Sequence, residues 1–237
     1  MKTFARSISI VGLLLVQSLA LRAEESHGIW SQFRGPGGSG VAALCQPPLK
    51  IDDALVAWKT PVPNGQSSPV IYDKLIFLTA LGDGDRLVTL AFDKASGKLA
   101  WRQPAPEGPL EKVHEANSPA ASTPCVDDQR VYVYFGSFGL LCYDHDGKEL
   151  WKKSIPTPKS LYGMSTSPIV YKDKIIMVID NDANLPNSKL SQSKIIAVDK
   201  VTGETAWETA RPFNRSGWST PAILENEGGD ELIVLGH

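Results

Sequence analysis

Four short segments of the sequence carry side chains suited to recognising a ligand. Each lies just before a Ser-Pro or Thr-Pro pair, is rich in glycine and serine, and contains one or two functional side chains. Loops of this kind bind ligands when a rigid scaffold holds them. The alternative is that these residues are solvated and satisfy one another. The candidate binding residues are His114, Glu115, Asn117, Tyr162, Arg215 and Trp218.

One acidic segment has the spacing of a calcium loop, with oxygen ligands at alternate positions of residues 180–184. Its sixth position is Leu185, where such loops need glycine, and its twelfth is Ser191, where they need an acidic side chain. A hairpin loop is therefore the better interpretation. The shorter Asp83–Asp85 segment likewise reads as a tight turn.

No catalytic motif accompanies these residues. The sequence lacks the Gly-x-Ser-x-Gly elbow, the His-Glu-x-x-His motif, a glycine-rich phosphate loop and Cys-x-x-Cys. Its four histidines, at positions 27, 114, 145 and 237, have no metal-ligand spacing. We therefore predict no catalytic residue and no metal site.

The composition is that of an ordinary soluble globular protein, with 237 residues, a formal charge of −2, 42% hydrophobic and 21% charged residues. The 20 glycines and 17 prolines favour turns and argue against a helix bundle. Because no block of Lys and Arg is present, the electrostatic footprint of a nucleic-acid binder is missing. We expect no nucleic-acid partner.

Residues 1–23 have the pattern of a secretory signal peptide. Lys2 and Arg6 precede an uncharged, mostly apolar run of 14 residues. That run is short for a membrane-spanning helix, which needs about 20 residues, and an uncleaved N-terminal anchor is the alternative. We expect cleavage to leave a mature chain that begins between residues 21 and 24. We expect an exported protein of the periplasm or cell envelope, without a transmembrane segment after cleavage.

The three cysteines, Cys45, Cys125 and Cys142, are far apart in sequence, so export permits at most one disulfide. None lies near the cleavage site to accept a lipid, and no lipoprotein anchor is expected. We interpret each cysteine as a small buried apolar residue.

Three segments share one pattern, and partial copies flank them. Each contains Ser/Thr-Pro, a short apolar stretch, a turn, an alternating strand, a strand that ends in Asp, a glycine turn and a strand with Trp. The aspartate caps the hairpin turn, and glycine takes the position with positive φ. The repeated residues are Asp93, Gly97 and Trp101; Asp144, Gly147 and Trp151; Asp199, Gly203 and Trp207; and Trp58, which ends an earlier copy.

The strands predict an all-β fold. Segments such as 131–135 and 174–179 alternate or are fully apolar, and each copy reads as a four-stranded antiparallel sheet. Because such a sheet cannot bury two apolar faces alone, the copies must stack. The Trp-to-Trp intervals of 43, 50 and 56 residues match the blades of a β-propeller and exceed the repeat of a leucine-rich solenoid.

We expect an N-terminal extended segment over residues 24–53 and propeller repeats over residues 54–237. The units span about 66–103, 120–153 and 165–209, with a partial unit over 218–237. One tryptophan per unit on the outer strand is what docking of one blade on the next requires. We therefore predict that the four repeated indoles pack between blades and do not form a platform for a ligand.

The pattern Ser/Thr-Pro … Leu-x-x-x-Asp-x-x-(Ser/Thr)-Gly-(Lys/Glu)-x-x-Trp resembles the pyrroloquinoline-quinone-like (PQQ-like) propeller repeat, with its tryptophan docking. The resemblance covers about residues 55–237, and the Trp-Ser-Gln-Phe-Arg-Gly-Pro of residues 30–36 looks like the opening of exported bacterial proteins of this group. It implies seven or eight blades, whereas this sequence holds about four. Either the sequence is a fragment, or it closes as a small ring in which the strand around Trp58 completes the last blade.

The family that this repeat resembles includes quinoprotein dehydrogenases and non-enzymatic assembly factors of the BamB type. In the dehydrogenases, the resemblance implies a quinone in the channel, a covering disulfide between adjacent cysteines, a calcium ion and an aspartate base. No two cysteines are adjacent here, and Cys125 and Cys142 are expected about 10 Å apart on alternate strands. No base or metal cage can be matched, so we expect no cofactor.

The sequence therefore predicts an exported binding or protein-interaction scaffold, with an unknown protein or small-molecule ligand at the rim of the propeller channel. The alternative is a quinoprotein dehydrogenase that uses PQQ and Ca²⁺ and acts on alcohols or sugars. Carbohydrate or peptide binding at the rim is a third interpretation.

Overall fold

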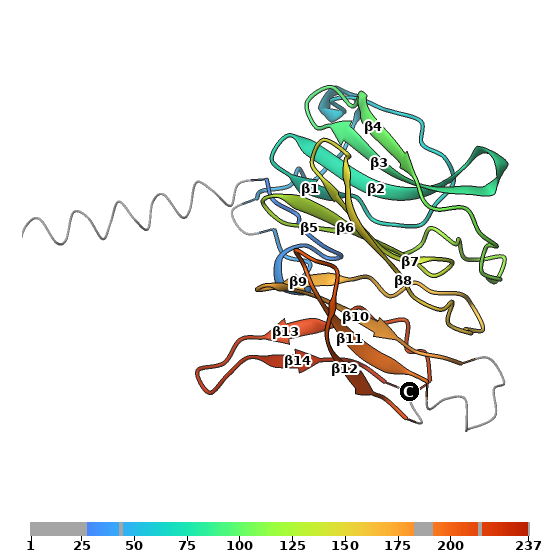
Figure 1. Ribbon diagram of the computed structural model, residues 1–237. Coiled ribbons are helices and arrows are strands. Elements are labelled where there is room, and N and C mark those ends of the chain that lie inside the picture. Colours follow the sequence, from blue (N-terminus) through green and yellow to red (C-terminus); the bar gives the residue numbers. More distant parts are fainter. Residues whose placement is uncertain (1–27, 43–44, 183–191, 213–214, 237) are drawn as a thin grey trace, which may run out of the picture.

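The computed structural model describes residues 28–42, 45–182, 192–212 and 215–236 (Figure 1). The predicted signal peptide, the end of the acidic 180–184 segment and residue 214, which directly precedes the candidate Arg215, lie outside the described residues.

The described chain is all-β, as predicted. Three four-stranded antiparallel sheets, blades A, B and C, follow one another in chain order, and a two-stranded sheet, blade D, comes last. Blade A contains β1 (Val70–Tyr72), β2 (Leu75–Gly82), β3 (Arg86–Asp93) and β4 (Leu99–Pro104). Blade B contains β5 (Cys125–Val126), β6 (Arg130–Phe135), β7 (Gly139–Asp144) and β8 (Glu149–Ser154). Blade C contains β9 (Ile169–Tyr171), β10 (Lys174–Ile179), β11 (Lys194–Asp199) and β12 (Thr205–Ala210), and blade D contains β13 (Ala222–Leu224) and β14 (Glu231–Ile233).

The helical elements of the described residues are three short 3₁₀ turns, η1 (Pro36–Gly38), η2 (Asp53–Leu55) and η3 (Asp83–Asp85). Within the same residues, no helix has the length and apolar character needed to cross a membrane.

The middle strands of blade B show why the blades stack. In β6, Val131 and Val133 belong to the apolar cluster shared with blade A, whereas Tyr132 and Tyr134 belong to the cluster shared with blade C. Successive side chains of a strand point to opposite faces, so a strand buried on both faces must be apolar throughout. A third cluster joins blades C and D. Strand β5 contacts both β1 and β9 on the inner side, and the arrangement is a partial β-propeller (Figure 1).

A tryptophan on the outer strand of blade A lies on the turn between the third and fourth strands of blade B. The Nε1 of Trp101 donates a hydrogen bond of 2.8 Å to the carbonyl of His145. Its ring covers Gly147, where an added Cβ would lie 2.8 Å from the indole. Gly147 also has a φ of 87°, so both the backbone and the indole require glycine there. We call this the indole–turn contact.

The same contact occurs twice more. Trp58 donates to the carbonyl of Lys94 at 2.9 Å and covers Gly97 of blade A; Trp151 donates to the carbonyl of Lys200 at 3.1 Å and covers Gly203 of blade C. In all three, the acceptor is the residue that follows the turn aspartate. Each aspartate accepts backbone N–H groups of its own turn, as predicted for the hairpin loops: Asp93 from Ser96, Asp144 from Asp146 and Lys148, and Asp199 from Val201 and Thr202.

The two ends of this series differ from its middle. Trp58 makes its indole–turn contact from a segment outside the named strands, so the structure has no strand around it. Trp207, on β12, is 39% exposed, and no hydrogen bond of its indole falls within the described part of the chain.

A second set of contacts joins the inner strands. The backbone N–H of Ser68 donates to Oγ1 of Thr123 at 2.9 Å, that of Thr123 to Oγ of Ser167 at 3.0 Å, and that of Ser167 to Oγ1 of Thr220 at 3.2 Å. These are the hydroxyl residues of the Ser/Thr-Pro pairs, and we call them the inner hydroxyl row. The proline that follows each one directly precedes β1, β5, β9 or β13, where it needs no ladder N–H.

The N-terminal segment lies against the inner strands. Trp30 exchanges two backbone hydrogen bonds of 2.8 Å with Ile71 of β1, and the carbonyl of Ser31 accepts the N–H of Val126 of β5 at 2.8 Å. Contacts between η1 and β13 extend this path toward blade D. In Figure 1, this blue segment runs beside β5 and β9.

The cysteines follow the expectation only in part. Cys125 and Cys142 are buried free thiols that both pair with Tyr132, from opposite sides of β6, which separates them by two strand spacings. Cys45 is exposed, so its interpretation as a buried apolar residue is wrong. It lies before the first blade, where no sheet covers it.

Replacing Trp151 with Ala should lower the free energy of unfolding by about 3 kcal/mol, because the ring and its hydrogen bond are both lost at the B–C interface. Trp207→Ala is the matched control, since its exposed indole should cost less than about 1 kcal/mol. Denaturant titration of both variants measures the difference. Equal losses would remove the docking role of Trp151.

Replacing Thr123 with Val should cost about 2 kcal/mol, because the N–H of Ser68 loses its acceptor while the side-chain volume is kept. Thr123→Ser keeps the hydroxyl and should cost less than about 1 kcal/mol. A Thr123→Val variant as stable as Thr123→Ser in the same titration would show that the inner hydroxyl row does not stabilise the fold.

Candidate functional site

The loops that join one blade to the next all lie at one end of the blades. In an antiparallel sheet of four strands, the start of the first strand and the end of the fourth lie at the same end. The loops between blades, residues 105–124 and 155–168 together with 215–221, therefore share one end, which we call the rim. In Figure 1, the first two of these loops are on the right, away from the N-terminal segment.

The rim brings His114 and Asn117 of the A–B loop against Tyr162 of the B–C loop. The carbonyl of Tyr162 accepts the backbone N–H of His114 at 3.3 Å and the side-chain amide of Asn117 at 2.8 Å. The imidazole and phenol rings lie 5.1 Å apart between centroids, at an interplanar angle of 59°. Both rings remain exposed to solvent.

Trp218 of the C–D loop extends this row. Its ring lies 5.3 Å from that of Tyr162 in an edge-to-face arrangement, and its Nε1 is 3.2 Å from both Oγ of Ser160 and the carbonyl of Gly163. Trp218 has a φ of 49°, a strained conformation for a bulky residue, of the kind found at functional sites. His114, Tyr162 and Trp218, one from each of three successive loops, form what we call the aromatic ledge.

The other two candidates do not join the ledge. Arg215 pairs with Asp182 at 3.1 Å, and that carboxylate is itself largely buried. Glu115 is exposed in the A–B loop. In the same region Asp180 accepts two hydrogen bonds from Arg211, and Asn181 accepts the backbone N–H of Lys159. The described part of the acidic segment is thus engaged with side chains and backbone of blade C and the rim.

Glu111 was not among the candidates, yet its carboxyl group lies directly beneath the rim. Its Oε2 accepts the backbone N–H of Met164 at 3.1 Å, and its side chain is 8% exposed. An added Cβ on Gly136 would lie 2.3 Å from Oε1, so a larger residue in this turn would displace the carboxyl group. Burial raises the pKa of Glu111 to about 7, although the Met164 N–H opposes the shift. A lone acidic residue in a loop reads as solvated, and nothing in the sequence distinguishes it.

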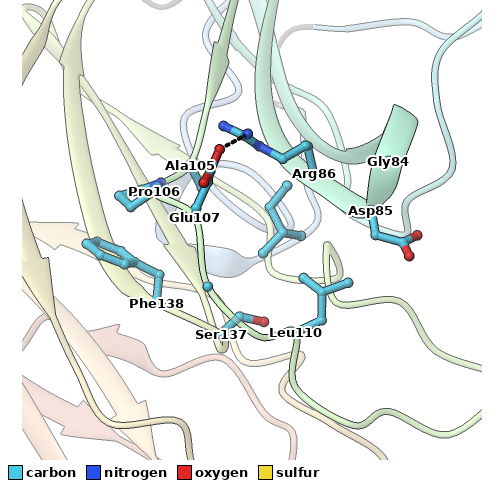
Figure 2. A pocket seen from close by; sticks show the side chains of 11 residues that line it. Gly84, Asp85, Arg86, Ala105, Pro106, Glu107, Leu110, Ser137 and Phe138 are labelled. Carbon is cyan, nitrogen blue, oxygen red and sulfur yellow. Dashed lines mark hydrogen bonds and ion pairs between the residues drawn. The ribbon is translucent and has the colours of Figure 1, made fainter.

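A shallow pocket of about 410 Å³ lies between blades A and B at the same end (Figure 2). Figure 2 shows the Arg86–Glu107 ion pair at one side of this pocket and Leu110 and Ser137 at the other. The side chain of Arg86 is 41% exposed and that of Glu107 is 79% exposed. The pocket is lined by polar and apolar residues in similar measure, and its one ion pair is screened by solvent, so it lacks the apolar enclosure of a typical ligand site.

The described residues do not fit a calcium-bound quinone. Within them, no three His, Cys, Asp or Glu side chains gather into a group that could hold a metal ion. The two buried cysteines are on alternate strands, and the third is exposed, so none can form a disulfide of adjacent residues over a cofactor.

Comparison with known proteins identifies the repeat. The sequence model of the family described as outer membrane protein assembly factor BamB matches residues 48–178 and 90–235. No curated protein matches the chain.

Solved propellers resemble the structure. Europium-containing methanol dehydrogenase superimposes with a TM-score of 0.53 at 14% identity, covering 79% of this chain and 33% of the enzyme. BamB from Moraxella catarrhalis gives 0.42 at 18% identity, covering 65% of this chain and 38% of BamB. The quinohemoprotein alcohol dehydrogenase from Comamonas testosteroni gives 0.43 at 19%, covering 62% and 21%.

The chain thus spans about a third of the length of the methanol dehydrogenase. At these identities the likeness concerns the fold. The sequence match extends over most of the chain and agrees with the repeated indole–turn contacts, and the chain belongs to the PQQ-like propeller family described as outer membrane protein assembly factor BamB.

Proposed function

We propose that this protein is exported to the cell envelope and acts there as a non-catalytic scaffold that binds a partner on the rim. The observation that carries the proposal is the aromatic ledge, in which three successive interblade loops each supply one ring. Aromatic residues contribute much of the energy at protein interfaces because they bury a large area at little entropic cost.

Hydrogen bonds hold the aromatic ledge in place while its rings remain accessible. Backbone and side-chain hydrogen bonds fix the carbonyls of Tyr162 and Gly163, while the phenol ring remains 44% exposed. A surface that is ordered before binding loses less entropy when a partner docks. By contrast, Trp30 and Ser31 of the N-terminal segment already occupy backbone groups along the inner strands β1 and β5.

The chemistry of the ledge favours a peptide segment with apolar side chains. The three rings are tilted and do not form a flat platform, and Leu161 beside them is 52% exposed. Tilted rings with an adjacent aliphatic side chain can hold a side chain between them. The description of the matching family as an assembly factor supports a protein partner for this chain as well.

Replacing Tyr162 with Ala should weaken binding of an apolar peptide at least about tenfold, the loss expected for an aromatic hot spot. The probe is a panel of extended peptides with aromatic and aliphatic residues at alternate positions. Their binding to residues 24–237 is measured by tryptophan fluorescence and calorimetry. Trp207→Ala removes an exposed aromatic side chain of β12, outside the three rim loops, and should leave the affinity unchanged.

Equal losses in the two variants would place binding away from the rim. Absence of any fluorescence change across the peptide panel would contradict the proposal. Oligosaccharides tested in the same assay would replace the peptide interpretation if they alone bind in a Tyr162-dependent way.

The dehydrogenase alternative has a direct test. Purified protein given pyrroloquinoline quinone and Ca²⁺ should not reduce an artificial electron acceptor with alcohols or aldose sugars, because the described residues supply no ligand cluster for calcium. Quinone without protein is the control. Reduction that requires protein, quinone and substrate together would overturn the scaffold interpretation.

A further inference from the structure

Glu111 links two rim loops through a buried group. Its backbone N–H donates to Oγ of Ser137 at 2.9 Å, which fixes the A–B loop on the turn between β6 and β7. Its Oε2 accepts the N–H of Met164 at 3.1 Å, which fixes the B–C loop. Met164 is 2% exposed and directly follows Gly163, whose carbonyl lies 3.2 Å from the indole nitrogen of Trp218.

The second carboxyl oxygen has no such bond. Oε1 of Glu111 is buried and has no hydrogen-bond partner among the described residues, and the same is true of the hydroxyl group of Tyr134. Tyr134 is 1% exposed and interacts electrostatically with Glu111. Two buried polar groups thus interact with each other, and no cation of the described residues pairs with the carboxyl group. Burying an ionised carboxylate without a countercharge is costly, whereas the neutral acid is tolerated.

No charged side chain of the described residues compensates for the buried charge that Glu111 would carry when ionised. Tyr134 is the titratable group of β6 that faces Glu111, and the turn 136–138 carries none. Lys112, His114 and Glu115 of its own loop and Lys159 of the B–C loop are all exposed. Burial, opposed only by the Met164 N–H, therefore dominates and raises the pKa of the group to about 7.

We propose that Glu111 is a proton-controlled link between the A–B and B–C loops, which holds the rim together when it is neutral and loosens residues 162–164 when it ionises. The proton of the neutral form is on Oε1, since Oε2 accepts the Met164 N–H. The link concerns the order of the rim itself. It rests on the proposed function only for its last consequence, that ligand binding at the ledge follows pH.

The direction in pH follows from the raised pKa. A carboxyl group that binds its proton more tightly in the closed rim than in an open, hydrated rim stabilises closure fully below its ordinary pKa. That contribution is lost as pH rises toward the folded value of about 7. The rim should therefore be tightest in mild acid and looser above neutrality.

Hydrogen exchange of the Met164 amide tests the link. After correction for intrinsic exchange, its protection factor in the wild type should fall roughly 20-fold between about pH 5.5 and 8, as expected from the raised pKa. Glu111→Gln keeps an acceptor for Met164 and cannot ionise, so its protection should stay high and flat. His114→Gln removes the imidazole that lies against Tyr162 and should retain the wild-type fall.

A flat wild-type profile, a fall that persists in Glu111→Gln, or a fall abolished by His114→Gln would each overturn the proposal. If Glu111→Gln does not fold, carbon-13 titration of the Glu111 carboxyl in the wild type decides: a midpoint near 7 supports the link, and the ordinary value of 4.5 overturns it. None of these measurements uses a ligand, so failure of the rim to bind peptides leaves their outcome unaffected.

Discussion

The indole of one blade lying on the glycine turn of the next is the contact on which the rest of this structure depends. A sheet whose middle strands are apolar on both faces is stable only when another sheet covers each face. The contact sets the distance and direction of that cover at the outer edge, because the indole nitrogen reaches a particular backbone carbonyl and the ring leaves no room for a Cβ.

The inner hydroxyl row joins neighbouring blades at their inner strands, as the indoles join them at their outer strands. Together they fix each blade at two separated places, so the loops between blades start and end at fixed points. Three loops can then bring His114, Tyr162 and Trp218 together, although neighbouring members of this set are 48 and 56 positions apart along the chain. The binding that we propose at the rim therefore depends on how the blades are joined, and it would be lost with their alignment even if every rim residue were kept.

The sequence predicts the blades well because the hairpin requires Asp, Gly and Trp at short, regular spacings. These spacings can be recognised directly in the sequence. It also places the rim loops, since they precede the Ser/Thr-Pro pairs. It does not predict that Arg215 pairs with Asp182, or that Cys45 is exposed, because neither follows from local spacing. The sequence does not predict that Glu111 is buried, because its burial depends on Gly136 and Met164, which lie 25 and 53 residues further along the chain.

The indole–turn contacts give the row of blades a polarity. At its first blade the turn around Gly97 is already covered by Trp58, whereas at β12 the indole of Trp207 stays in solvent. A sheet that extends blade D could therefore receive the indole of Trp207 on its glycine turn, whereas the corresponding place on blade A is already taken by Trp58. The contact between Trp58 and the turn around Gly97 thus closes the blade A side of the row to the indole of another molecule.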